Sequence, residues 1–190
     1  MLNYIKFIEI LISLQSIFLS TMIPVLISVP FTDKLDISSE LPVTWQIPTI
    51  ILITIIFTKK VVISAYSIYL FLGLFFIPIF NQGGSLGYLL TPNFGYLIGI
   101  YPLINIIGNI NKKNRFKFLY FILSGVIAII ALHLTGIIYN LLQLLYYRQI
   151  DVFFYNLGYY SLGKIGYHFL MLIPLSLLFK IINHIKYKKT

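Results

Sequence analysis

The stretch NKKNRFKFLYFILSGVIAIIALHLTGIIY, residues 111–139, decides the class of fold. Its first seven residues carry four positive charges, at Lys112, Lys113, Arg115 and Lys117, and the 22 residues that follow contain no Asp, Glu, Lys or Arg. A helix needs about 20 mostly apolar residues to cross a bilayer, and Lys and Arg gather on its cytoplasmic side. The pattern therefore predicts a transmembrane helix over residues 118–139 that begins at a cytoplasmic boundary.

The whole chain has the composition of a membrane protein. Of its 190 residues 59% are hydrophobic and only 10% are charged, whereas soluble domains are about 25% charged. Such a chain cannot cover a water-facing surface, so apolar side chains must face lipid. The net charge is +9, but no basic helix or aromatic platform accompanies it, and we expect no nucleic-acid partner. The absence of cysteine excludes disulfides and thiolate metal sites.

Further apolar stretches complete a single transmembrane domain over residues 1–190. The predicted spans are 7–29, 45–58, 61–80, 94–110, 118–139 and 158–182. The first stretch is too long for a signal peptide, contains Glu9 and lacks a small-residue cleavage site, so we interpret it as a retained span. The expected fold is an all-α bundle of six transmembrane helices.

The positive charges predict the orientation of this bundle. With the amino terminus in the cytoplasm, the external segments contain only Lys34 and Arg148, and Lys164 lies within the last span. The other eleven of the fourteen Lys and Arg residues (14 − 2 − 1 = 11) then fall on the cytoplasmic side. This asymmetry predicts cytoplasmic amino and carboxyl termini in a cell-membrane protein.

The connectors between the spans are too short for a nucleotide-binding domain. No GxxxxGK[ST] motif occurs, although this motif is the usual cradle for nucleotide phosphates. We therefore expect that any energy for transport comes from a partner or an ion.

Lys164 is the polar residue that most needs an explanation. It lies six residues into the predicted last span, and Ser161 and His168 share its helical face, three residues before it and four after. Such a face is too polar for lipid. We interpret Lys164 as a cation that receives the carboxylate of a ligand; the alternative is a side chain that snorkels to the outer surface.

Other polar residues in the spans have simpler interpretations. His133 is expected to be a hydrogen-bonding partner between helices. No metal site or catalytic residue is predicted, because Glu9 is the only carboxylate within a span and neither HExxH nor GxSxG occurs.

Small residues predict two close helix contacts. Gly95 and Gly99 form a GxxxG pattern, which favours close packing. The first span has Ser13, Ser16 and Ser20 on one face, where another helix of this chain or of a partner could come close.

The segment NQGGSLGYLLTPN, residues 81–93, connects the third and fourth predicted spans. Its Gly83 and Gly84 permit backbone conformations that other residues avoid. The sequence leaves two interpretations open, a lid that offers backbone N–H groups to a ligand and a plain tight reversal.

Three segments resemble the BioY family, the biotin-binding substrate-capture components of energy-coupling-factor transporters. LPVTWQ, residues 41–46, is similar to the family's P-[VI]-T-x-Q. GLFFIPIFNQGGSLGYLLTPNFGYLIG, residues 73–99, is similar to its G-L-P-V-F, glycine-rich loop and L-x-G-P-T-G-G-Y-L-I-G. SLGK, residues 161–164, matches the family's D-[LI]-[LIV]-K at the lysine, but Ser161 replaces the acid. Some members carry arginine near Gly83, and Asn93-Phe94 replaces the usual Thr/Ser-Gly.

The resemblance implies a substrate-binding subunit, not an enzyme and without a cofactor, that captures biotin from outside. It implies that Lys164 pairs with the ligand carboxylate, beneath the loop that contains Gly83 and Gly84. It implies ring or polar contacts from Thr44, Gln46, Tyr88, Asn93, Tyr96 and Ser161. The implied partners are a transmembrane coupling subunit and two ATPase subunits, which would dock on the face of Ser13, Ser16 and Ser20.

Three alternatives stay open at this point. Ser161 allows a different small carboxylated vitamin as the ligand. A lipid-modifying membrane enzyme would have to draw an acid–base pair or a nucleophile from His133, His168 and Lys164. A ligand-free assembly factor would tolerate the loss of Lys164.

Overall fold

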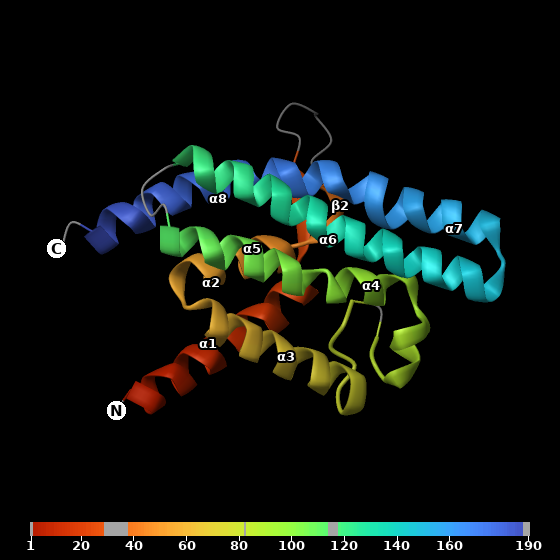
Figure 1. Ribbon diagram of the computed structural model, residues 1–190, viewed down its shortest axis with the longest axis horizontal. Helices are drawn as coiled ribbons and strands as arrows, with labels where there is room; N and C mark the ends of the chain where they lie inside the picture. The colour runs from red at the N-terminus through yellow and green to blue at the C-terminus, as the bar shows by residue number, and fades with distance from the viewer. Residues whose placement is uncertain (1, 29–37, 82, 114–117, 188–190) are drawn as a thin grey trace.

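The protein is mostly helical in the computed structural model, which describes residues 2–28, 38–81, 83–113 and 118–187 (Figure 1). Its elements in chain order are α1 (Leu2–Met22), β1 (Pro24–Ser28), β2 (Ser38–Thr44), α2 (Gln46–Ile56), α3 (Lys59–Phe75), the 3₁₀ helix η1 (Leu86–Leu90), α4 (Pro92–Ile98), α5 (Ile100–Lys113), α6 (Phe118–Tyr147), α7 (Ile150–Asn156), the π-helical turn η2 (Leu157–Leu162) and α8 (Gly163–Tyr187).

The helices form a bundle with α6 at its centre. α6 and α8 lie side by side, α4 and α5 pack on the other side of α6, and α1 packs against α3 at the far edge (Figure 1). The core between them contains large apolar and aromatic side chains such as Tyr66, Tyr69 and Phe121. This arrangement brings α2, α4, α6 and α8 together around one polar site.

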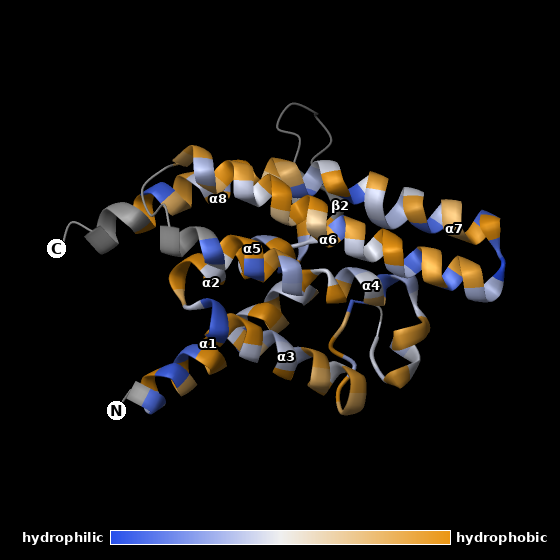
Figure 2. Ribbon diagram, in the orientation of Figure 1, coloured by the Kyte–Doolittle hydropathy of each residue, from blue (hydrophilic) through white to orange (hydrophobic). Residues whose placement is uncertain are grey.

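Within the described residues, three helical segments are long and apolar enough to cross a membrane: Asn3–Met22, Phe118–Tyr147 and Ile150–Ile182. Their outer faces carry exposed apolar side chains, for example Leu145 at 74% exposure. Figure 2 shows many hydrophobic residues, in orange, along α6 and α8. Burial of such side chains in lipid removes them from water. The chain is therefore a membrane protein, as the composition predicts.

Six crossings stay a prediction. α3 has 17 residues, a length of about 26 Å at 1.5 Å per residue, close to the thickness of the hydrocarbon core. α4 and α5 follow one another across Gly99, whose backbone stays in the helical region. α2, with 11 residues, is the shortest of the apolar stretches that were predicted to cross.

The structure is mostly helical, as predicted, but two short strands that the sequence did not predict follow α1. The first predicted span extends to Val29, but α1 ends at Met22 and β1 follows from Pro24. Pro24 has no N–H to donate, and the residue before a proline disfavours helical geometry. β1 pairs antiparallel with β2, with Pro24 opposite Thr44 and Ser28 opposite Ser38. The predicted external cation Lys34 lies outside the described residues.

The boundaries of the last two predicted spans also differ from the structure. α6 continues eight residues beyond Tyr139, and helical structure resumes at Ile150 instead of Gly158. The polar residues in this region misled the prediction, because the tertiary structure gives some of them partners: Gln143, for example, donates to the carbonyl oxygen of Leu90 at 2.7 Å. Lys164 consequently lies 14 residues after Ile150, deep in a long helical segment.

The GxxxG pattern packs closely, as predicted. A Cβ atom on Gly95 would lie 2.3 Å from Cβ of Tyr139, and one on Gly99 would lie 2.6 Å from the carbonyl oxygen of Leu132. Both contacts are with α6, so the two glycines let α4 and α5 approach the central helix.

Both ends of the described chain lie toward one end of the molecule. In Figure 1 the start of α1, the turn between α2 and α3, and the end of α8 all lie toward the left. Lys59, at the start of α3, donates to Asn109 near the end of α5 at 3.1 Å. The number of crossings and the side on which the termini lie stay predictions.

Candidate functional site

A cavity of about 80 Å³ lies between α2, α4, α6 and α8. We call it the inner cavity. Among the residues that the structure describes, those that line it include no acidic one; they are Val43, Thr44, Gln46, Ile47, Asn81, Tyr88, Asn93, Tyr96, Leu97, Ile100, Leu132, His133, Tyr160, Lys164 and His168. The cavity thus combines aromatic and aliphatic walls with hydrogen-bonding groups and one ammonium group.

Lys164 is half-buried and lines this cavity. Its ammonium nitrogen lies 5.0 Å from the ring centroids of both Tyr159 and Tyr160, within cation–π range. These tyrosines belong to η2, and single π-helical turns inside α-helices often occur at functional sites. The ammonium group therefore lies against aromatic faces, beside a cavity whose described lining contains no carboxylate.

A chain of hydrogen bonds connects four side chains beside Lys164. The hydroxyl oxygens of Tyr96 and Ser161 are 2.7 Å apart, and Ser161 Oγ lies 3.4 Å from His133 Nδ1. His133 Nε2 lies 3.0 Å from His168 Nδ1. His133 is therefore a hydrogen-bonding partner between helices, as predicted, and it also lines the cavity.

This chain has a simple chemical consequence. A neutral imidazole has one N–H donor and one acceptor nitrogen, and a hydroxyl can donate one hydrogen bond while it accepts others. If Tyr96 donates to Ser161, the far nitrogen of His168 ends the chain as a donor. If the order is reversed, His168 ends it as an acceptor and Tyr96 donates outward. Tyr96 and His168 both line the cavity, so the chain can present one donor and one acceptor to a ligand.

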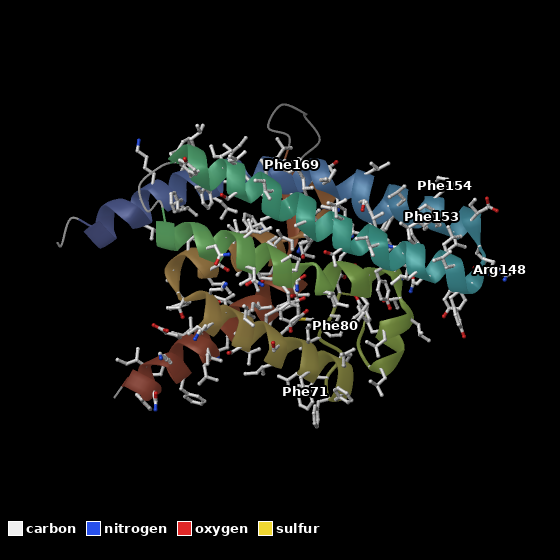
Figure 3. All side chains as sticks on the ribbon, in the orientation of Figure 1. Phe71, Phe80, Arg148, Phe153, Phe154 and Phe169 are labelled. Carbon is white, nitrogen blue, oxygen red and sulfur yellow. The ribbon has the colours of Figure 1, made fainter. Side chains whose placement is uncertain are left out.

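The segment after α3 supplies a second polar group. Tyr88 donates to the carbonyl oxygen of Asn81 at 2.9 Å and accepts from Nδ2 of Asn93 at 2.7 Å. Burial raises the pKa of Tyr88 to about 12, so its hydroxyl keeps its proton. The Tyr88 ring packs against Phe80, with 4.7 Å between centroids, and Figure 3 labels Phe80 below α4.

Thr44 and Gln46 approach the cavity from the end of β2 and the start of α2. The backbone N–H of Gln46 donates to Thr44 Oγ1 at 3.4 Å, and its side-chain amide donates to the Tyr69 hydroxyl at 3.5 Å. The β1–β2 hairpin, which the sequence did not predict, is thus what carries Thr44 to the site.

Gly83 and Gly84 do not line the inner cavity. Gly83 exchanges two backbone hydrogen bonds with Phe80 and has a φ of 125°, a conformation that favours glycine. A Cβ atom on Gly84 would lie 2.6 Å from the backbone of Pro78. The structure supports the second interpretation of this segment, a tight reversal.

The structure therefore brings six of the nine predicted ligand-binding residues to one cavity: Thr44, Gln46, Tyr88, Asn93, Tyr96 and Lys164. Ser161 lies behind this layer, 2% exposed, and connects Tyr96 to His133. The sequence analysis missed Asn81 and Tyr160. The spacing of Tyr160 four residues before Lys164 was the available signal for one of them.

The predicted docking face on α1 is mostly covered by the chain itself. Ser13 is fully buried and Ser20 nearly so, and they donate to the carbonyl oxygens of Glu9 and Ile17. Ser16 is half-buried. The i, i+3, i+7 spacing placed all three on one face, but α3 packs against α1, so a partner can reach only Ser16 among them.

Comparisons with known proteins place the fold and the family of this chain. A solved structure described as the S-component for biotin from an ECF-type ABC transporter superposes with a TM-score of 0.61 at 17% identity, covering 93% of this chain and 91% of that one. This likeness shows a shared fold. A probable biotin transporter BioY from Lysinibacillus sphaericus is 30% identical over 99 residues, which are 52% of this chain and 50% of that protein. The aligned part thus spans about half the length of that relative.

The match that covers most of the sequence is with a family model. The model of the BioY family matches residues 5–181, a range that includes most of α1 and every described residue that lines the inner cavity. The resemblance found in the sequence is confirmed, and this chain belongs to the BioY family.

Proposed function

We propose that this chain is the substrate-binding subunit of an energy-coupling-factor transporter and that it captures biotin in the inner cavity. The observation that carries the proposal is the ammonium group of Lys164, which lines a cavity with no acidic residue among its described lining residues. A cation in such a place needs an anion, and lipid tails supply none. The carboxylate of the ligand supplies it.

The remaining lining matches the rest of such a ligand. The ureido ring of biotin carries N–H donors and a carbonyl acceptor, and the ends of the Tyr96–Ser161–His133–His168 chain offer one acceptor and one donor. The aromatic rings of Tyr88, Tyr96 and Tyr160 provide apolar contact area. A charge-assisted hydrogen bond contributes about 1.5–3 kcal/mol, so micromolar or tighter binding needs only a few such contacts with apolar burial.

The inner cavity must widen to admit this ligand. Its volume of about 80 Å³ is small, whereas pockets for small molecules typically have about 300–1,000 Å³. η1 and the turn before it pack at the edge of the bundle against α3 and α4. We therefore expect this segment, with Tyr88, to shift when the ligand enters from outside.

The partners follow from the same proposal. Since no Walker motif occurs in the sequence, ATP hydrolysis falls to two ATPase subunits, which act through a transmembrane coupling subunit. Both termini of this chain face the cytoplasm in the cytoplasmic membrane. The coupling subunit docks on the exposed side of α1, at and around Ser16.

The direct test is a binding titration with the purified full-length protein in lipid nanodiscs. Isothermal titration with biotin should give one site per chain with micromolar or tighter affinity. Absence of binding at millimolar biotin would refute the proposal.

A second candidate ligand is another small carboxylated vitamin, and Ser161 favours it because the family motif has an acid there. The same titration with a panel of carboxylated vitamins separates the two, since the cognate ligand should bind at least tenfold more tightly than the others.

The geometry gives the enzyme alternative little support. Ser161 is the hydroxyl nearest to His133, but it is 2% exposed and does not line the inner cavity. A substrate in the cavity would meet Tyr96 before it met Ser161.

A further inference from the structure

A second cavity, of about 210 Å³, lies between α6, α7 and the start of α4. We call it the outer cavity. Val152 and Phe153 of α7 form one wall, and Asn140 and Gln143 of α6 form another. Figure 3 labels Phe153 on α7, close to the turn that carries Arg148. The segments that resemble known family motifs contribute two residues here, Leu90 and Pro92.

The outer cavity follows the inner cavity along α6. Leu132 and His133 line the inner one, and Asn140 begins the outer one two turns later. Gly136 lies between them, and a Cβ atom there would lie 2.4 Å from the Tyr96 ring. Tyr96 stacks on Tyr160 at 5.7 Å between centroids, and both line the inner cavity. Pro92 lines the outer cavity and the next residue, Asn93, the inner one, so a thin layer of side chains separates the two.

Two buried amides face the outer cavity without complete hydrogen bonding. Asn140 is 3% exposed; its Nδ2 donates to the carbonyl oxygen of Gly136 at 2.9 Å, but its Oδ1 is buried without a partner. Asn156, on α7, is 7% exposed, and within the described part of the chain its side chain has no hydrogen bond. A buried polar group without a partner costs about 1–3 kcal/mol. Leucine would avoid this cost at position 140, so Asn140 Oδ1 needs a polar occupant of the cavity to satisfy it.

The lining defines the chemistry of that occupant. None of the ten lining residues is charged, while four carry amides: Asn140, Gln143, Gln149 and Asn156. Amides donate and accept hydrogen bonds, so they suit a neutral planar group that does both, such as an amide or a ureide. A carboxylate would find no cation in the lining. It would be better placed toward Arg148, which is exposed at the adjoining turn.

We propose that the outer cavity is a transient binding site for the uncharged amide-like or ureide ring of the ligand, occupied before the ligand passes Tyr96 into the inner cavity. This inference rests on the proposed function. In this proposal Asn140 and Asn156 affect the rate at which the ligand associates, and not the equilibrium affinity of the inner cavity. A site on the access path accelerates association and dissociation alike and leaves the equilibrium constant unchanged.

The test is the rate of biotin association with the full-length protein, followed by stopped-flow fluorescence of Trp45. This tryptophan is the only one in the chain and lies between Thr44 and Gln46 of the inner cavity. Asn140→Leu and Asn156→Leu should each slow association at least fivefold while the Kd changes less than twofold. Asn140→Leu should also raise the melting temperature, since it removes a buried acceptor without a partner. Asn105→Leu, at a half-buried amide on α5 that lines neither cavity, is the control.

Val152→Phe provides a version of the test that does not alter a buried residue. Val152 is 47% exposed at the outer cavity, so the larger side chain should fill the cavity without unfolding the protein, and association should slow again. Leu145→Phe, on the exposed side of α6, is its control.

The outer site would be refuted if biotin associated at the wild-type rate with Asn140→Leu, Asn156→Leu and Val152→Phe. In that case biotin binding by the wild type would still support the proposed function. Equal slowing in the two control variants would also overturn it. A wild type that does not bind biotin at all would refute the proposed function and this inference with it.

Discussion

Replacement of Lys164 tests the central electrostatic argument. In the free protein the ammonium group lies 5.0 Å from two tyrosine ring centroids, and each cation–π contact contributes about 0.5–2 kcal/mol. A ligand carboxylate adds a charge-assisted hydrogen bond of about 1.5–3 kcal/mol. At 1.4 kcal/mol per factor of ten, its loss weakens binding by roughly 10- to 150-fold. We therefore expect Lys164→Met, which keeps the apolar stem of the side chain, to weaken biotin binding at least tenfold.

A comparison of two ligands isolates the charge. Isothermal titration of the wild type should show at least tenfold preference for biotin over its uncharged carboxamide, because only the carboxylate pairs with the ammonium group. Lys164→Met should lose this preference and bind both ligands with similar affinity. Lys180→Ala, at an exposed position of α8, should behave as the wild type. If Lys164→Met retained wild-type affinity, or if it weakened both ligands equally, Lys164 would not pair with the carboxylate.

Three further substitutions test the packing, the hydrogen-bond chain and the docking surface. Gly136→Ala should lower the free energy of unfolding by about 1–3 kcal/mol and weaken biotin binding, because its Cβ atom would lie 2.4 Å from the ring of Tyr96. The control Gly166→Ala, whose Cβ atom would have no atom within 4 Å, should not lower stability or weaken binding. Equal melting temperatures in the two variants would contradict the Gly136–Tyr96 contact. Ser161→Ala should cost about 1–3 kcal/mol of stability in chemical denaturation, since it leaves buried partners unpaired, and an unchanged midpoint would refute a continuous chain. Ser16→Leu should abolish co-purification of the coupling subunit while biotin binding survives. Ser20→Leu, at a buried position, should instead destabilise the fold. If the Ser16→Leu protein still associated with the coupling subunit, the proposed docking surface would be refuted.

Local sequence determined the membrane character of the protein. The cationic cluster at 111–117 followed by an uncharged stretch required a membrane helix, and α6 contains the whole predicted span 118–139. GxxxG predicted a close helix contact, and the i−3 and i+4 neighbours of Lys164 predicted a polar face. These features depend on residues that are adjacent along the chain or along one helix, so periodicity and composition suffice to detect them.

Only the tertiary structure decided how the site is assembled. Thr44 reaches it on a hairpin whose strands pair residues 24 and 44, and no local pattern records such a pairing. Polar residues after Tyr139 suggested a connector, yet contacts across the bundle let α6 continue to Tyr147. Hydrogen bonds join Tyr96 to Ser161 across 65 positions and His133 to His168 across 35. The energy of such contacts depends on the distance between the two side chains in space. That distance is set by the fold and cannot be read from the spacing of the residues in a single sequence.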